Sequence, residues 1–175
     1  MKTVKGKKRG EVFEKFKNEI KEKAFKLEVL QYYGEGAEEK PSLKEWLRGN
    51  KEESVRLLKQ NSKQMALWWP KDERIQKTRI HIVEYPLTPY IEWEIEAYRD
   101  VNIPEAGENV YLLDSKYVKE YPEIPEGWIF DDNRAISIIY DKNGKVKEFE
   151  IYEDEEIKPF LWLRDELFKL PIKRV

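Results

Sequence analysis

The sequence predicts an α+β domain with N-terminal helices, a small mostly antiparallel sheet, one helix inserted into the sheet and a C-terminal helix. Early in the chain, apolar residues recur every three or four positions, as on one face of a helix. From Ile75 onward the chain becomes rich in β-branched residues, which favour strands. Asn143-Gly144 separates two such runs, and Asn-Gly in that place is the strongest short-range signal of a hairpin.

The first helix is expected over residues 11–31, where the apolar stripe comprises Phe13, Phe16, Ile20, Ala24 and Leu27. Gly34 and Gly36 follow and favour its termination, because glycine accepts the left-handed conformation that ends helices. Residues 1–10 hold five basic residues and two glycines, which predicts a flexible basic arm. Residues 11–175 are expected to form a single α+β domain.

Two further helices are expected before the sheet. Ser42 and Glu45 have the spacing of a capping box, and Gly49 ends the short helix that they begin. A second helix is predicted over residues 52–67, with Val55, Leu58 and Met65 facing inward.

Ile75 to Val83 reads as a strand, and Thr88-Pro89 follows it. The segment after Pro89 fits a strand by alternation and a helix by its three- and four-residue spacing. A hydroxyl cap followed by proline at the first helical position is a helix start, so we predict the inserted helix here.

The remaining elements follow from turn residues. A turn at Gly107 precedes a strand at 109–113, and another strand is expected at 128–130. The hairpin comprises residues 134–140 and 145–152, and the last helix spans residues 155–170 with Pro159 in its first turn.

Composition limits the classes of function. The 175 residues include 39% charged residues, a net charge of −2 and no cysteine. Such a chain has no disulfide framework, no thiolate nucleophile and no global basic field for nucleic acid. The charge content is typical of proteins from hot environments, and a genome whose codons favour Lys, Glu and Ile gives the same bias. No apolar run is long enough for a membrane span, and we expect a cytoplasmic protein.

Several short motifs occur in a recognisable order along most of the chain. They are Ala24-Phe25-Lys26-Leu27-Glu28, Arg79 to Tyr90 with Pro86-Leu87-Thr88 inside it, Asn102 with Ala106-Gly107-Glu108, Trp128-Ile129-Phe130-Asp131, and the turn from Asp141 to Gly144. In this order and spacing the chain resembles a domain-of-unknown-function family that is abundant in actinomycetes. Its members are often encoded beside WhiJ-type helix-turn-helix regulators.

The resemblance implies a helix at Ala24–Glu28 and a regulatory role with a protein partner, such as a transcription regulator or an anti-sigma or sigma-type protein. It implies no biochemical activity. The chain departs from the family pattern where His81 replaces an arginine and Tyr85 replaces an acid.

The residues favour a non-catalytic protein over an enzyme. His81 is the only histidine, and no nucleophile motif accompanies it. Glycines do not form a phosphate-binding loop, so we expect no cofactor. An acidic cluster of Glu92, Glu96 and Glu108 leaves a second hypothesis open, a defence- or toxin-like nuclease that uses metal ions. Because solvated acids are common in so charged a chain, we predict no metal site.

The first hypothesis is therefore an intracellular regulatory or adaptor domain that binds another protein, with Arg79 and Tyr90 on its contact surface. Nucleic-acid binding through the arm with Arg74, Lys77 and Arg79 is disfavoured by the net charge. The candidate functional surface comprises Arg79, His81, Glu84, Thr88, Tyr90, Glu94, Asn102, Glu108, Trp128 and Asp131.

Overall fold

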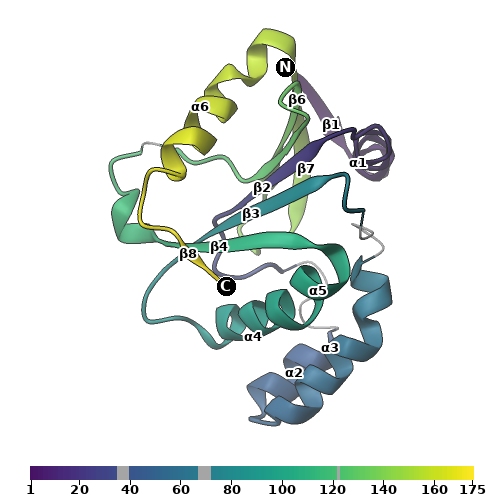
Figure 1. Cartoon of the computed structure of the whole chain (residues 1–175), viewed down its shortest axis with the longest axis vertical. Helices are drawn as coiled ribbons and strands as arrows, with labels where there is room; N and C mark the ends of the chain where they lie inside the picture. Colours follow the sequence, from purple (N-terminus) through teal and green to yellow (C-terminus); the bar gives the residue numbers. More distant parts are fainter. Residues whose placement is uncertain (35–39, 67–71, 122) are drawn as a thin grey trace.

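The computed structural model describes residues 1–34, 40–66, 72–121 and 123–175. Its centre is one mixed sheet of eight strands in the order β1-β7-β6-β5-β2-β3-β4-β8, with helices around it (Figure 1). The predicted α+β class is confirmed. The sheet is larger than the small sheet expected from the sequence. The segment predicted as a basic arm and the second half of the first predicted helix contribute strands, and so do two residues after the last predicted helix.

The strands are β1 (Lys2–Lys5), β2 (Lys23–Glu28), β3 (Gln76–Val83), β4 (Glu108–Asp114), β5 (Gly127–Phe130), β6 (Arg134–Tyr140), β7 (Val146–Glu153) and β8 (Lys173–Arg174). The α-helices are α1 (Lys8–Asn18), α2 (Pro41–Leu47), α3 (Lys51–Ala66), α4 (Pro89–Ala97), α5 (Ile103–Ala106) and α6 (Lys158–Leu167). A π-helical turn, η1 (Tyr98–Asn102), continues α4, and short 3-10 turns occupy η2 (Ser115–Tyr117) and η3 (Asp154–Ile157).

The middle of the sheet is parallel. Strand β3 pairs in parallel with β2 on one side and β4 on the other, whereas the remaining neighbours pair antiparallel. Parallel neighbours need long crossover connections, and here α2 and α3 connect β2 to β3 while α4, η1 and α5 connect β3 to β4. The predicted hairpin of β6 and β7 is confirmed, with Arg134 opposite Glu153.

The predicted helix over residues 11–31 is wrong in its second half. The helix ends at Asn18, and Lys23–Glu28 forms the central strand β2. The helix implied by the family resemblance at Ala24–Glu28 is therefore also absent. Ala24 and Leu27 continue the helical spacing by coincidence, while Phe25 and Leu27 alternate with Lys26 and Glu28, which is the two-residue period of a strand.

The basic arm predicted for residues 1–10 is instead part of the fold. Lys2–Lys5 forms the edge strand β1 on β7, and α1 already begins at Lys8. Val4 is the residue of β1 that is buried, whereas the lysines of the strand point to solvent. Charged side chains on an edge strand discourage edge-to-edge pairing with another chain, which accounts for the basic composition.

The sheet has two differently covered faces. Phe25, Ile80 and Leu113 belong to a core with Leu163 and Leu167 of α6. On the opposite face, α1 packs on Ala24 and Phe130 through Phe13 and Phe16, and a separate core joins α2, α3 and α4. Figure 1 shows α6 and α4 on opposite sides of the sheet. Of the helices in the described ranges, none has the length and apolar character needed to cross a bilayer.

The helices begin partly at the residues that the sequence predicted. Oγ1 of Thr88 accepts a hydrogen bond from the amide of Ile91, as predicted, and Pro159 lies in the first turn of α6. The capping box at Ser42 is wrong, because Lys40 is the N-cap residue of α2. Ser42 is buried in the first turn, where its hydroxyl accepts a hydrogen bond from the indole of Trp93 at 2.6 Å. The predicted helix over 52–67 is α3, and Leu67 lies outside the described residues.

Candidate functional site

Strand β3 carries alternating polar and apolar residues. One face of the strand carries Lys77, Arg79 and His81. The other face carries Ile80 and Ile82, which belong to the core under α6. All three polar residues are buried, because α4, η1 and α5 cover this face. Buried charges require partners, so the surroundings of this strand must supply them.

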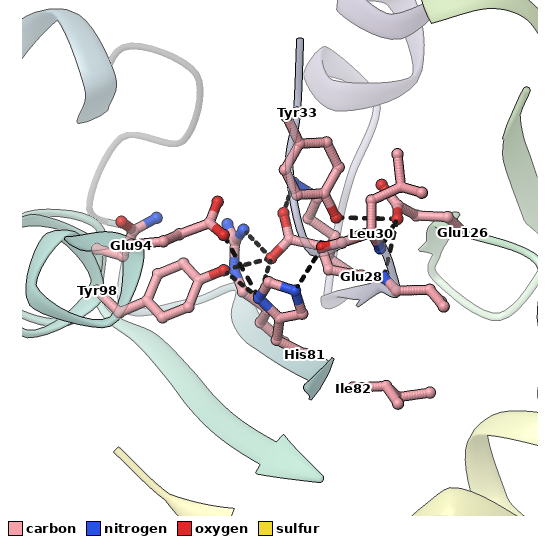
Figure 2. A network of polar contacts seen from close by, with 12 residues as sticks. Glu28, Leu30, Tyr33, His81, Ile82, Glu94, Tyr98 and Glu126 are labelled. Carbon is pink, nitrogen blue, oxygen red and sulfur yellow. Dashed lines mark hydrogen bonds and ion pairs between the residues drawn. The ribbon is translucent and has the colours of Figure 1, made fainter. Parts of the chain in front are cut away.

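Arg79 is the centre of a buried ion-pair network. Figure 2 shows Glu28, His81, Glu94 and Tyr98 of this network close together. Its Nε and Nη2 donate to the two carboxylate oxygens of Glu108 at 2.8 and 3.1 Å, and its Nη1 donates to Oε2 of Glu28 at 2.8 Å. Asn102 adds a hydrogen bond to Oε1 of Glu108 at 3.3 Å. The guanidinium also lies 5.1 Å from the ring centre of Tyr98. One side chain therefore joins β2, β3, β4 and η1.

Glu28 is the acid at the other end of this arrangement. Its Oε2 accepts hydrogen bonds from Arg79 and from the hydroxyl of Tyr98, and Lys26 forms an ion pair with Oε1. Burial raises the pKa of Glu28, but the charges of Arg79 and Lys26 outweigh it and hold the pKa well below its ordinary value. Glu28 is therefore ionised at neutral pH.

His81 has no exposed surface. Its Nε2 lies 3.1 Å from the carbonyl oxygen of Leu30, which can only accept, so Nε2 carries a hydrogen. Its Nδ1 lies 2.9 Å from the hydroxyl oxygen of Tyr98, whose single hydrogen is directed to Glu28. Burial lowers the pKa of His81. The ring is thus neutral at pH 7, with its hydrogen on Nε2, and Nδ1 can act as an acceptor.

Glu94 of α4 lies close to this nitrogen. Its Oε2 lies 3.6 Å from Nδ1 of His81, is enclosed and makes no hydrogen bond within the described chain. Burial and the nearby charge of Glu28 raise the pKa of Glu94 to about 8, so this carboxyl holds a proton at pH 7. With Glu94 and His81 both neutral, Arg79 and Lys26 balance Glu28 and Glu108.

A second buried acid lies beside this network. Glu126 accepts hydrogen bonds at Oε2 from the amides of Val29 and Leu30 and from the hydroxyl of Tyr33, and at Oε1 from the hydroxyl of Tyr140. Burial raises the pKa of Glu126, with the charge of Glu28 as a further cause. Figure 2 shows how Leu30 lies between Glu126 and His81. The two clusters together fix the segment that leaves β2.

The structure brings five of the ten predicted surface residues into this network, namely Arg79, His81, Glu94, Asn102 and Glu108. Sequence reasoning missed Glu28, Tyr98 and Glu126. Tyr98 follows Glu94 by four residues, so the spacing that places both on one helix face was a signal for it. Glu28 was hidden by the wrong helix assignment, and no local pattern in the sequence indicates Glu126.

The other five predicted residues lie elsewhere. Thr88 caps α4, and the carboxylate of Asp131 accepts three backbone amides at the start of β2. Trp128 packs on Phe13 and beneath the ammonium group of Lys26. Glu84 is exposed, and Tyr90 is buried.

The expected contact surface of Arg79 and Tyr90 is therefore wrong, because both residues are buried. Of the three cations proposed for nucleic acid, Lys77 and Arg79 are buried, whereas Arg74 is exposed and forms a surface ion pair. Lys77 donates to the carbonyl of Ala106, Arg79 pairs with the acids of the network, and Arg74 pairs with Asp72.

The acids proposed for a nuclease do not converge. Both oxygens of Glu108 accept hydrogen bonds from Arg79, Glu92 is exposed, and Glu96 pairs with Arg99. No group of three acids or histidines in the described ranges is arranged to hold a metal ion.

An apolar groove lies on the opposite side of the molecule from this network, between α6 and the segment that follows η2. It has a volume of about 560 Å³, and its walls are Tyr121, Pro125, Pro159, Phe160, Trp162 and Leu163, with Glu120 and Glu123 at the rim. Trp162 of this groove keeps 59% of its surface exposed. Its ring centre is 6.3 Å from that of Tyr121.

The fold and the site define an α+β domain with a buried ion-pair network at the centre of a mixed sheet. A family model described as "Domain of unknown function (DUF6879)" matches residues 11–173, so the chain belongs to that family. The match extends from α1 to β8.

Among solved structures, the chain is similar to TrmBL2, an archaeal chromatin protein that binds DNA by a novel mode, with 11% sequence identity and a TM-score of 0.46. The similarity covers 99% of this chain and 54% of TrmBL2, so the chain spans about half the length of that protein. No relative is found among curated protein sequences.

Proposed function

We propose that this chain is a non-catalytic regulatory or adaptor domain that binds another protein through the groove around Trp162. The observation that carries the proposal is the exposure of Trp162 in a groove whose walls are formed by six aromatic, proline or leucine side chains. Exposed apolar patches with a polar rim are typical of protein-binding sites, and tryptophan is among the residues that contribute most to binding.

The buried network supports a structural role for the family's characteristic residues. Its charges are neutralised within the protein, and its carboxylates are already hydrogen-bonded to Arg79, Tyr98 and Asn102. Such a network fixes the positions of four elements and leaves binding to another surface. The partner that we propose, in line with the family resemblance, is a regulatory protein of the cytoplasm.

The test is affinity purification from the source organism with three baits: the wild-type chain, Trp162→Ala and Leu47→Ala. Leu47 is a matched control, because it is a similarly exposed apolar residue at the end of α2, and 60% of its surface is accessible. We expect a defined protein to bind to the wild-type chain and to Leu47→Ala but not to Trp162→Ala. Equal recovery with all three baits, or with none, contradicts the proposed binding surface.

A further inference from the structure

The groove around Trp162 has the chemistry of a site for an extended peptide. Its walls combine two prolines with aromatic rings, and the rings of Tyr121 and Trp162 are inclined by 40° at 6.3 Å. Proline-rich segments in the polyproline II conformation dock in grooves lined by aromatic residues, because their conformation is preformed and loses little entropy on binding.

The size of the groove favours a segment over a globular surface. A volume of about 560 Å³ is in the range of sites that enclose a small ligand or a few side chains. A stable contact between two folded proteins, including two copies of this chain, buries at least about 1,000 Å² with good complementarity.

The negative charge beside the groove favours a segment with a basic residue next to its prolines. Glu120 and Glu123 are exposed, and within the described ranges neither carboxylate makes a hydrogen bond or an ion pair. The acids of α6 are different, because they have basic partners: Asp165 forms an ion pair with Arg164, and Glu166 forms one with Lys169. Two unpaired acids beside an apolar groove complement a cation on the ligand.

We propose that the groove binds a proline-containing segment of the partner protein that carries an arginine or lysine beside its prolines. This inference rests on the proposed function and names the chemistry of the partner. Prolines of the segment pack against the surface that Tyr121 and Trp162 form, and the basic residue lies against Glu120 and Glu123.

The experiment uses the full chain and short synthetic P-x-x-P peptides flanked by arginine, with binding measured by calorimetry. Two control peptides replace the prolines with alanine or the arginines with glutamate. We expect Trp162→Ala to weaken binding of the first peptide at least about tenfold, as for a central tryptophan at an interface. The double variant Glu120→Gln, Glu123→Gln is expected to weaken binding severalfold and to reduce its salt dependence. Leu47→Ala is expected to bind as the wild type does.

Equal binding of the alanine peptide, or no effect of Trp162→Ala in a chain with an unchanged circular dichroism spectrum, overturns the inference. Self-association measured by sedimentation and abolished by Trp162→Ala also overturns it, because the occupant is then a second copy. If the purified partner needs Trp162 but P-x-x-P peptides do not bind, the inference fails while the proposed function stands.

Discussion

Arg79 and Glu108 lie 29 residues apart in the sequence and form two parallel hydrogen bonds, 2.8 and 3.1 Å long, between adjacent strands β3 and β4. This paired geometry is the strongest that arginine makes with a carboxylate. Both side chains are buried, with 8% and 4% of their surface exposed. The pair therefore holds the parallel part of the sheet together and also connects it to η1 through Asn102.

Removal of Arg79 is expected to be strongly destabilising. Arg79→Met leaves Glu28 and Glu108 buried without their main counter-charge, which costs roughly 3–5 kcal/mol in typical proteins. Urea unfolding measures the loss. Arg56→Met is the matched control, because Arg56 pairs with Glu53 on an exposed face of α3, and its loss is expected to leave the unfolding midpoint unchanged. Equal effects of the two variants contradict the structural role of Arg79.

The Glu94 carboxyl is expected to make stability fall as the pH rises. The folded chain keeps the proton of Glu94 up to about pH 8, because burial raises its pKa, whereas the unfolded chain releases it near the ordinary value of 4.5. Between these pH values the folded state binds more protons, so the free energy of unfolding decreases with pH.

Glu94→Gln removes this ionisation while it keeps the shape of the side chain. From pH 5 to pH 9 the wild type is expected to lose up to about 4 kcal/mol relative to Glu94→Gln, since one pKa unit corresponds to about 1.4 kcal/mol. Urea unfolding of both proteins at each pH gives the comparison. Parallel pH profiles for the two proteins indicate that Glu94 is ionised in the folded state and refute the proton assignment.

The protonation of His81 can be observed directly, because it is the chain's only histidine. We expect nitrogen-15 spectra at pH 7 to show a neutral ring with the hydrogen on Nε2, as the contact with Leu30 requires. Burial lowers its pKa, so the ring is expected to gain its charge only below the usual range of histidine. A titration near pH 6.5 in the folded chain contradicts the burial of this ring.

Thr88 is expected to contribute about 1 kcal/mol as the N-cap residue of α4, the usual value for loss of such a cap. Thr88→Ala removes the hydroxyl, whereas Thr88→Ser keeps it. Thermal unfolding should therefore show a lower midpoint for the alanine variant and a midpoint close to that of the wild type for serine. If serine fails to restore the midpoint, the methyl group rather than the cap accounts for the effect.

Elements with local signals could be predicted from the sequence. The hydroxyl of Thr88 and the ring of Pro89 begin α4, and the turn around Asn143 and Gly144 joins β6 to β7. Each signal acts within a few residues, so no tertiary contact was needed to interpret it. Strand β2 was missed because the spacing of Ala24 and Leu27 also continues the stripe of α1.

The network could be predicted only in part. The sequence pointed to polar residues of β3, α4 and β4 as a candidate functional surface. Glu28 was missed because it lies 51 residues before Arg79, and no local pattern joins the two residues. The groove was missed for a similar reason. It forms between α6 and the segment that contains Tyr121 and Pro125, which lie far apart in the sequence, and no local pattern joins them.

Hydrogen exchange of the chain, with and without the partner recovered by affinity purification, tests the central claim most directly. The account predicts that the partner protects amides of residues 118–121, 123 and 124 and of α6, and leaves α2 and the exposed end of the hairpin unchanged. Protection confined to other elements, with α6 exchanging as in the free chain, contradicts the claim that this family member binds its partner through the groove around Trp162.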